Sequence, residues 1–339
     1  MKFNAKAIIQ LILSLGLGIG LVYWFVSQLS PEQRTETLNA FRRADYKWLL
    51  LIPLIGLWSN YHRTQRWRQL LKASGYTPGF FNTFFSVMIM YFANLAIPRL
   101  GEVLRCTILS KNEHVPVEKS IGTMVVERLF DVIFLFGIGG VLFIAEGKRM
   151  YDFFIQNIFG KKEDSGEANV IGILVPAALV VLIFTGSIYI VRKHGIARLT
   201  TLIKEKFTGL YYSLLSVKDV NKPLLFIWHT MAMWFCYLMM SFVAFQALPE
   251  TSGLSIWAGL ACLFFGAFAV AATPGGIGVY PLLIRSTLAL YGINEIIGGA
   301  YGTLTWALQT AGALGGGLFA LVAINIFNKN RVATPHASR

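Results

Sequence analysis

Two groups of charged side chains interrupt otherwise apolar stretches of this chain. Each group combines arginines with carboxylates: Arg99, Glu102 and Arg105 in the first, and Glu127, Arg128 and Asp131 in the second. Glu127 and Asp131 are four residues apart, so on a helix they share one face, whereas Arg128 projects about 100° away. Two stacked carboxylates need a cation nearby. We expect Arg99 or Arg105 to supply it.

A third candidate offers backbone groups instead of charged side chains. The turn Pro274–Gly278 contains Gly275, Gly276 and Gly278, and Tyr280 follows it directly on an expected helix. The N-terminus of a helix carries about half a positive charge and free N–H groups, which suit an anion such as phosphate. We therefore include these four residues in the predicted binding site.

The composition excludes an ordinary soluble domain. Hydrophobic residues make up 55% of the 339 residues and charged residues only 14%, whereas soluble domains carry about 25% charged residues. The net charge of +13 would also suit a nucleic-acid-binding protein, so the positions of the basic residues must decide. The three cysteines have no disulfide or zinc spacing, and no nucleotide-binding, zinc-protease or serine-hydrolase motif is present. We expect neither a cofactor nor enzyme activity.

Long uncharged runs predict an all-α polytopic membrane protein, since a crossing needs about 20 residues. Trp48–Asn60 is a shorter candidate span, and Ser120–Ala145 is expected to be helical. The long runs are Ala7–Val26, Val170–Val191, Pro223–Leu248, Leu254–Ile284 and Ile296–Phe327, the last of which must tilt, protrude or break near Gly315–Gly317. A helix beginning at Pro31 and an amphipathic helix over Ile196–Val217 are expected to lie on the membrane, although the second also suits packing on another loop.

Two apolar runs are interrupted by proline and glycine. Phe80–Leu109 breaks at residues 97–102, and Leu254–Tyr291 breaks at residues 273–278. The freed backbone groups at such breaks must be satisfied by protein or by a water-filled cavity. If helix resumes after Pro98, Glu102 and Arg105 share a face and Arg99 lies at the tip. The two breaks align at an offset of 177 residues.

The distribution of basic residues favours re-entrant hairpins at both breaks. Six full spans then remain, both termini are cytoplasmic, and nineteen of the thirty lysines and arginines lie inside against eight outside. If Phe80–Pro98 were a full span, the loop Arg192–Lys222 with its seven basic residues would fall outside. Hairpins that enter from opposite faces predict an inverted-repeat transporter whose site lies where the tips meet. Two purely structural kinks are the alternative.

This arrangement forms a single integral membrane domain over residues 1–339. Its predicted parts are spans and the first hairpin in 1–145, a middle span with a cytoplasmic amphipathic helix in 146–222, the second hairpin and last spans in 223–328, and a cytoplasmic tail in 329–339. The basic cytoplasmic side suits an anionic lipid surface. Nucleic acid is therefore not needed to explain the net charge.

Three motifs resemble those of a known family. Arg99–Arg105, Val125–Asp131 and Pro274–Gly278 are similar to the hallmark motifs of the flippase-like transmembrane region of lysylphosphatidylglycerol synthases. Arg66–Leu71 is similar to a cytoplasmic stretch of that region, and the resemblance covers essentially the whole chain. It implies a region that moves an aminoacylated lipid between leaflets, after a separate soluble domain has made it. The chain ends soon after Phe327, so we expect a stand-alone member without the synthase domain.

The sequence thus predicts a lipid flippase or translocase of the bacterial cytoplasmic (inner) membrane. Its substrate would be an anionic or aminoacylated phospholipid or a lipid-linked intermediate, bound by Arg99, Arg105 and the N-terminus of the second hairpin. Glu102, Glu127 and Asp131 would hold the arginines or contact a cationic headgroup moiety. An ion-pair network that only pins the hairpin is an alternative for these charges. Two other functions stay open: a secondary transporter of a small soluble anion, and a non-catalytic subunit that partners a lipid-modifying enzyme or glycosyltransferase.

Overall fold

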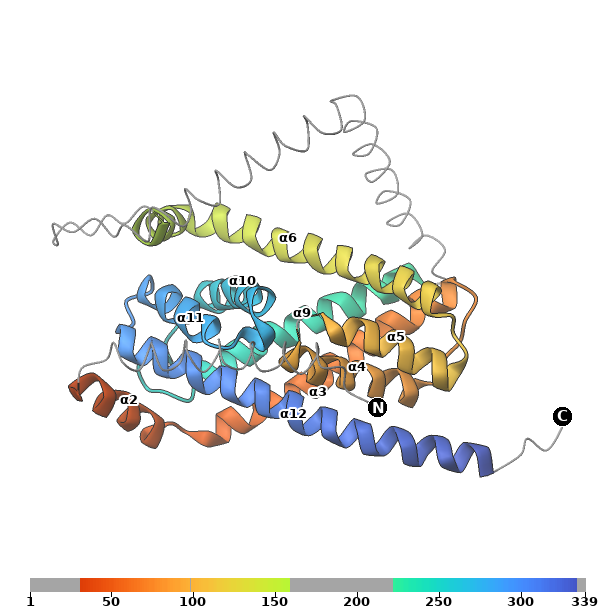
Figure 1. Ribbon diagram of the computed structural model, residues 1–339. Coiled ribbons are helices and arrows are strands. Elements are labelled where there is room, and N and C mark those ends of the chain that lie inside the picture. Colours follow the sequence, from red (N-terminus) through yellow and green to blue (C-terminus); the bar gives the residue numbers. More distant parts are fainter. Residues whose placement is uncertain (1–30, 98, 159–221, 334–339) are drawn as a thin grey trace, which may run out of the picture. The chain divides into compact units, whose positions relative to one another are not determined.

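The computed structural model describes residues 31–97, 99–158 and 222–333, and these ranges contain helices and turns but no strands (Figure 1). The described helices are α2 (Pro31–Arg43), α3 (Tyr46–Ala73), α4 (Phe80–Ala96), α5 (Leu100–Glu113), α6 (Val117–Ile158), α9 (Pro223–Phe245), α10 (Ile256–Ala272), the 3-10 helix η2 (Pro274–Gly276), α11 (Val279–Ala289) and α12 (Glu295–Ala333). The predictions for Ala7–Val26, Val170–Val191 and Ile196–Val217 lie outside the described residues.

The chain divides into two compact units, one formed by residues 1–138 and 220–339 and the other by residues 139–219. Of the second unit, the structure describes residues 139–158, the C-terminal part of α6. This part is kinked at Glu146, whose backbone is not helical (φ −126°, ψ 28°). Arg149 pairs with the Glu146 carboxylate at 2.7 Å. Apart from the end of α6, the helices and contacts described below belong to the first unit.

Three described helices are long and apolar enough to cross a membrane. They are Val117–Arg149 within α6, Pro223–Phe245 and Glu295–Lys329 within α12. The last apolar run was expected to tilt, protrude or break near Gly315–Gly317. The break is wrong, because α12 continues through these three glycines. A Cβ atom on Gly317 would overlap the Phe92 side chain, and one on Gly316 would lie 2.7 Å from Met88. The glycines therefore let α4 pack closely against α12.

Helix α3 is longer than the span expected at Trp48–Asn60. It runs for 28 residues and begins after Asp45, whose side chain accepts a hydrogen bond from the Lys47 backbone N–H at 3.0 Å. Its buried positions recur every three or four residues: Ser59, His62, Arg63, Arg66, Trp67, Leu70 and Leu71. This is the spacing of one helix face. Two arginines therefore lie on the face that α3 turns toward the protein.

The first apolar run breaks where the sequence predicts and doubles back as a helical hairpin. At the open end, the Gly79 N–H donates to the Glu113 carboxylate at 2.9 Å, and at the tip, the Gly101 N–H donates to the Asn94 side chain at 2.8 Å. Helices α4 and α5 are therefore antiparallel. Arg99 occupies the bend with a left-handed backbone (φ 63°). Re-entry of this hairpin from one side of a membrane stays a prediction.

The second run also forms a helical hairpin, with η2 between α10 and α11. Its tip relies on glycine, because Gly275, Gly276 and Gly278 all have positive φ values, of 57°, 76° and 73°, which side chains rarely tolerate. The Trp306 indole N–H donates to the Gly275 carbonyl at 2.9 Å. Gly275 also packs against Leu95 at the end of α4. The two tips therefore contact each other, through an apolar side chain.

Each hairpin packs into its own buried core. The first core lies around α3, α4 and α5 and consists of Trp67, Leu71, Val87, Met90, Cys106, Leu109 and Val115. The second joins α10, α11 and α12 to α9 and the N-terminal half of α3, and includes Cys262, Tyr280, Ile284, Leu288 and Tyr301. Of the charged residues predicted to do chemistry, Arg105 borders the first core through the Trp67 ring.

Candidate anion-binding site

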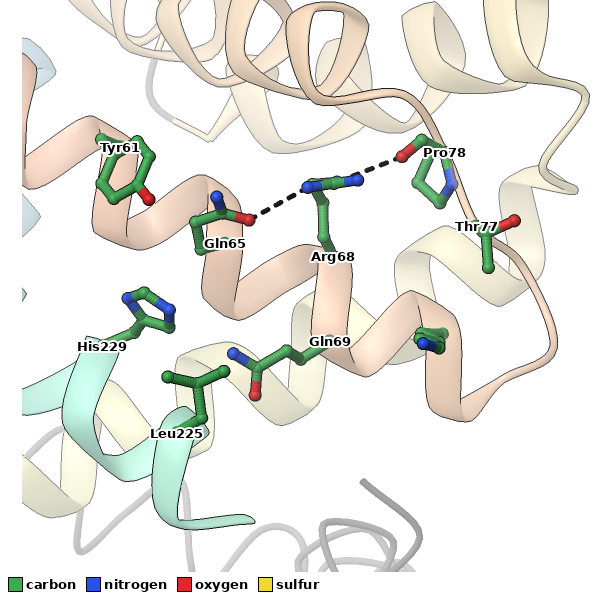
Figure 2. A pocket seen from close by; sticks show the side chains of 9 residues that line it. Tyr61, Gln65, Arg68, Gln69, Thr77, Pro78, Leu225 and His229 are labelled. Carbon is green, nitrogen blue, oxygen red and sulfur yellow. Dashed lines mark hydrogen bonds between the residues drawn. The ribbon is translucent and has the colours of Figure 1, made fainter. Parts of the chain in front are cut away.

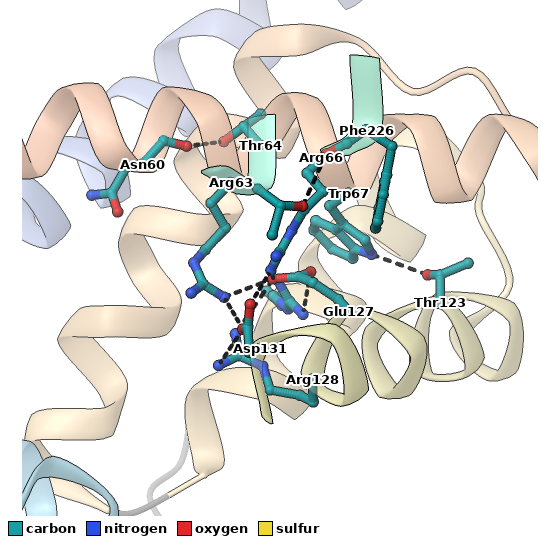
Figure 3. Close-up of polar contacts among 12 residues, drawn as sticks. Asn60, Arg63, Thr64, Arg66, Trp67, Thr123, Glu127, Arg128, Asp131 and Phe226 are labelled. Carbon is teal, nitrogen blue, oxygen red and sulfur yellow. Dashed lines mark hydrogen bonds and ion pairs between the residues drawn. The ribbon is translucent and has the colours of Figure 1, made fainter. Parts of the chain in front are cut away.

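Six charged side chains from three helices meet beside the first hairpin (Figure 3). This arginine cluster consists of Arg63 and Arg66 from α3, Arg105 from α5, and Glu127, Arg128 and Asp131 from α6. Glu127 is completely buried at its centre. Its Oε1 atom lies 2.7 Å from Arg63 Nη1 and 3.1 Å from Arg66 Nη2, and its Oε2 atom lies 3.0 Å from Arg105 Nη2.

The cluster opens toward Arg128 and Asp131. Asp131 pairs with Arg66 at 2.7 Å and with Arg63 at 3.3 Å, and its side chain is 13% exposed. Arg128 is 36% exposed and reaches both carboxylates at 3.5 Å. Arg128 starts about 100° away from Glu127 on the helix, and its long side chain returns to both carboxylates. An incoming group would meet Arg128 first.

Positive charge exceeds negative charge in the cluster by two, since four guanidinium groups surround two carboxylates. Several buried nitrogens have no hydrogen-bond partner in the described part of the chain: Nε of Arg63, Nε and Nη1 of Arg66, and all three side-chain nitrogens of Arg105, whose Nη2 is only ion-paired. Buried charges and donors are costly unless they are paired. The arrangement can therefore accept an anion.

Aromatic rings flank the three buried arginines. The ring centroids lie 4.3 Å from the Arg105 guanidinium for Trp67, 5.8 Å from that of Arg63 for Tyr91, and 6.0 Å from that of Arg66 for Phe226. The Trp67 indole N–H donates to Thr123 Oγ1 at 3.0 Å, which fixes the closest ring. Each cation–π contact contributes about 0.5–2 kcal/mol. The rings thus help to keep the cations in place without neutralising them.

The structure brings four of the predicted site residues together and separates six from them. Arg105, Glu127, Arg128 and Asp131 meet in the arginine cluster. Arg99 is exposed, and no ion pair involves it among the described residues. Glu102 is partly buried on α5, and its Oε2 atom has no hydrogen-bond partner among the described residues. The others, Gly275, Gly276, Gly278 and Tyr280, belong to the second hairpin, and no hydrogen bond or ion pair in the described ranges joins them to the cluster.

Arg63 and Arg66 belong to the cluster but were not predicted as site residues. Both follow the candidate span Trp48–Asn60 and were expected among the cytoplasmic basic residues. They lie three residues apart and continue the spacing of Leu49, Ile52 and Ser59 on the buried face of α3. That periodic signal could have found them if the apolar segment had been extended beyond Asn60. Among the described residues, no group of three or more His, Cys, Asp or Glu side chains is placed to hold a metal ion.

Comparison with known proteins gives a family and one partial relative. Residues 11–317 match the profile of the family described as the lysylphosphatidylglycerol synthase TM region. Over 75 residues the chain is 40% identical to the UPF0104 membrane protein MJ1595 of Methanocaldococcus jannaschii, a match that covers 21% of this chain and 22% of that protein. The chain thus matches about a fifth of this relative's length. No solved structure matches the chain.

Proposed function

Because this membrane protein belongs to the lysylphosphatidylglycerol synthase TM region family, we propose that it is a lipid translocase. It moves a phospholipid or lipid-linked molecule with an anionic headgroup between the leaflets of the bacterial cytoplasmic membrane, with both termini on the cytoplasmic side. The observation that carries this proposal is the surplus of two positive charges in the arginine cluster, in which three of the four arginines are buried.

The chemistry of the cluster fits a phosphate headgroup. A guanidinium group offers two parallel N–H donors that match two oxygens of a phosphate. Arg105 and Arg66 both have donors without hydrogen-bond partners among the described residues, and a bound phosphate would satisfy these donors and reduce the surplus charge. Glu127 and Asp131 keep the arginines in position while the site is empty. The headgroup therefore completes a site that the carboxylates have already organised.

The surroundings of Arg128 favour a lipid over a small soluble anion. Val125, Val132 and Phe136 lie three, four and eight residues from Arg128 on α6, so they share its face. All three are exposed, by 46%, 49% and 62%. Acyl chains can lie along such an apolar face while the headgroup reaches the guanidinium at its edge. A pathway for a soluble anion would instead call for polar side chains beside the entrance.

Leaflet exchange in phosphatidylcholine vesicles tests this proposal, with fluorescent phosphatidylglycerol or fluorescent phosphatidylcholine as the tracer. Arg128→Gln removes one positive charge at the entrance, and because a charge-assisted contact contributes about 1.5–3 kcal/mol, exchange of phosphatidylglycerol should slow at least about tenfold. Arg43→Gln is the matched control, because Arg43 is 46% exposed and pairs with Glu250 away from the cluster. It should leave the rate unchanged.

Equal exchange of phosphatidylglycerol by the wild type and Arg128→Gln would contradict headgroup binding at the cluster. Uptake of radiolabelled inorganic phosphate into the vesicles, without lipid exchange, would favour the secondary transporter instead. If neither lipid nor phosphate moves and a lipid-modifying enzyme depends on the protein, the function would be that of a non-catalytic membrane subunit.

A further inference from the structure

A separate cavity of about 560 Å³ lies among α3, residues 77–78 and the beginning of α9 (Figure 2). The polar residues of its lining include Gln65, Arg68, Gln69 and Lys72 of α3 and His229 of α9, and none of the described residues that line it carries a carboxylate. None of these residues belongs to the arginine cluster. The volume falls within the range of small-molecule sites, about 300–1,000 Å³, so the cavity can hold more than a bare ion.

Arg68 is held in position by protein atoms but keeps donors for a ligand. Its Nε donates to the Pro78 carbonyl at 3.1 Å, its Nη1 donates to Gln65 Oε1 at 3.0 Å, and the guanidinium lies 5.9 Å from the Phe80 ring centroid. A guanidinium has five N–H donors, and these bonds use two of them. Figure 2 shows the guanidinium held between Gln65 and Pro78. Such a fixed cation is suited to bind an anion directly.

Lys72 adds a second cation one helical turn after Arg68. Like charges at this spacing repel each other, and among the described residues neither Arg68 nor Lys72 forms an ion pair with a carboxylate. An anion between them would remove that repulsion. Phosphate suits this pair because it offers several oxygens, one set for the guanidinium fork and another for the ammonium group.

Gln69 adds a hydrogen-bond acceptor to the two cations. Gln69 is one of the residues that line the cavity, and its Oε1 atom is buried and has no hydrogen-bond partner in the described ranges. A buried acceptor of this kind is satisfied by a donor from a ligand. His229 also lines the cavity, where its Nδ1 atom lies 2.8 Å from His62 Nδ1, and no hydrogen bond joins it to Gln69 among the described residues.

We propose that this cavity binds a phosphate group whose bearer also carries a hydroxyl or ammonium group. Arg68 and Lys72 bind the phosphate, and Gln69 accepts from the neighbouring donor. A phospholipid headgroup and a soluble phosphate ester both have this chemistry. Binding here does not depend on the proposed lipid translocation, because the cavity and the arginine cluster share no residue.

The test uses the full chain in phosphatidylcholine nanodiscs and two probes. Titration calorimetry measures binding of glycerol 3-phosphate, and native mass spectrometry measures retention of phosphatidylglycerol added to the nanodiscs. Arg68→Gln should weaken binding of at least one probe by about tenfold or more, since it removes a charged donor. Lys72→Gln, at an exposed position, should weaken it by about threefold and serves if the Arg68 variant does not fold. Arg43→Gln, which lies outside both the cavity and the arginine cluster and pairs with Glu250, should leave this binding unchanged.

A third variant tests the role of the donor. Gln69→Leu should weaken binding of glycerol 3-phosphate by about fivefold but not that of methyl phosphate at pH 8, which has no hydroxyl group on its carbon. Loss of glycerol 3-phosphate binding in Arg68→Gln supports a soluble ester as the source, and loss of only phosphatidylglycerol supports a lipid. Unchanged binding of both probes in Arg68→Gln and Lys72→Gln overturns the proposal, as does an equal loss of binding in the control Arg43→Gln.

Discussion

The two helical hairpins share a backbone plan but differ in what they carry. Helices α4 and α10 each have 17 residues, and a shift of 177 residues places residues 80–96 onto 257–273, within one residue of α10. The same shift places Arg105, which is fully buried, onto Leu282. One hairpin therefore contributes a buried cation to a charged site, and the other has a partly buried leucine at the corresponding position.

The tips differ in the same way. In the first hairpin a polar side chain, that of Asn94, accepts from the Gly101 N–H at 2.8 Å. In the second, glycines with positive φ form the bend and Trp306 donates to the Gly275 carbonyl. The contact between the tips is made by the apolar residue Leu95, although the charged residue Arg105 lies nearby in the sequence. The broken helix is thus a scaffold that does not itself require charge, and α3, α5 and α6 determine where the charge gathers.

Among the variants that test this comparison, Glu127→Gln should have the largest effect, and it changes the charged cluster beside the first hairpin. Glu127 lies within 3.5 Å of four arginines, and removal of one partner from a buried ion pair costs about 3–5 kcal/mol. We expect a loss of that size in the free energy of unfolding, measured by SDS titration in mixed micelles. The adjacent cations would then repel each other without a central anion.

The double variant Glu127→Gln, Arg105→Gln is the control for this prediction. Because it removes a positive charge together with the negative one, it should recover part of the loss, by about 0.5–3 kcal/mol, the range of coupling energies for contacting residues. Additive losses would show that Glu127 does not act through Arg105.

Gly101→Ala should have the next largest effect, because it obstructs the packing of α5 on α4. A Cβ atom at this position would overlap the backbone oxygen of Met90 and lie 2.7 Å from Asn94 Oδ1. A backbone carbonyl of a helix cannot move aside as a side chain can, so we expect a loss of about 3 kcal/mol in unfolding free energy. Gly122→Ala, with open space around its Cβ, is the matched control and should be neutral or slightly stabilising. A neutral Gly101→Ala would contradict the close helix contact.

The sequence predicted the breaks and most helix positions because proline, glycine and uncharged runs act locally. It also placed Glu127 and Asp131 on one helix face, which needs only the helical period. It did not find Arg63 and Arg66 as their partners, because that contact joins residues more than sixty positions apart. A tally of charges by loop cannot distinguish a solvated arginine from one on a buried helix face. The binding site expected where the tips meet stays a prediction, and the structure adds Arg63 and Arg66 of α3 as partners of Glu127.

Gly275→Ala should have a smaller effect than Gly101→Ala and tests the contact between the two tips. The new Cβ would lie 2.6 Å from Leu95 Cδ2, a flexible side-chain end, and the residue would keep φ 57°, which costs about 1–2 kcal/mol for a residue other than glycine. We expect a loss of about 2 kcal/mol in unfolding free energy. In a Leu95→Ala background the steric part disappears while the backbone part stays, so Gly275→Ala should then cost about 1 kcal/mol less. The same cost in both backgrounds would mean that the tips do not touch at Leu95, and the hairpins would then have to be compared as separate elements.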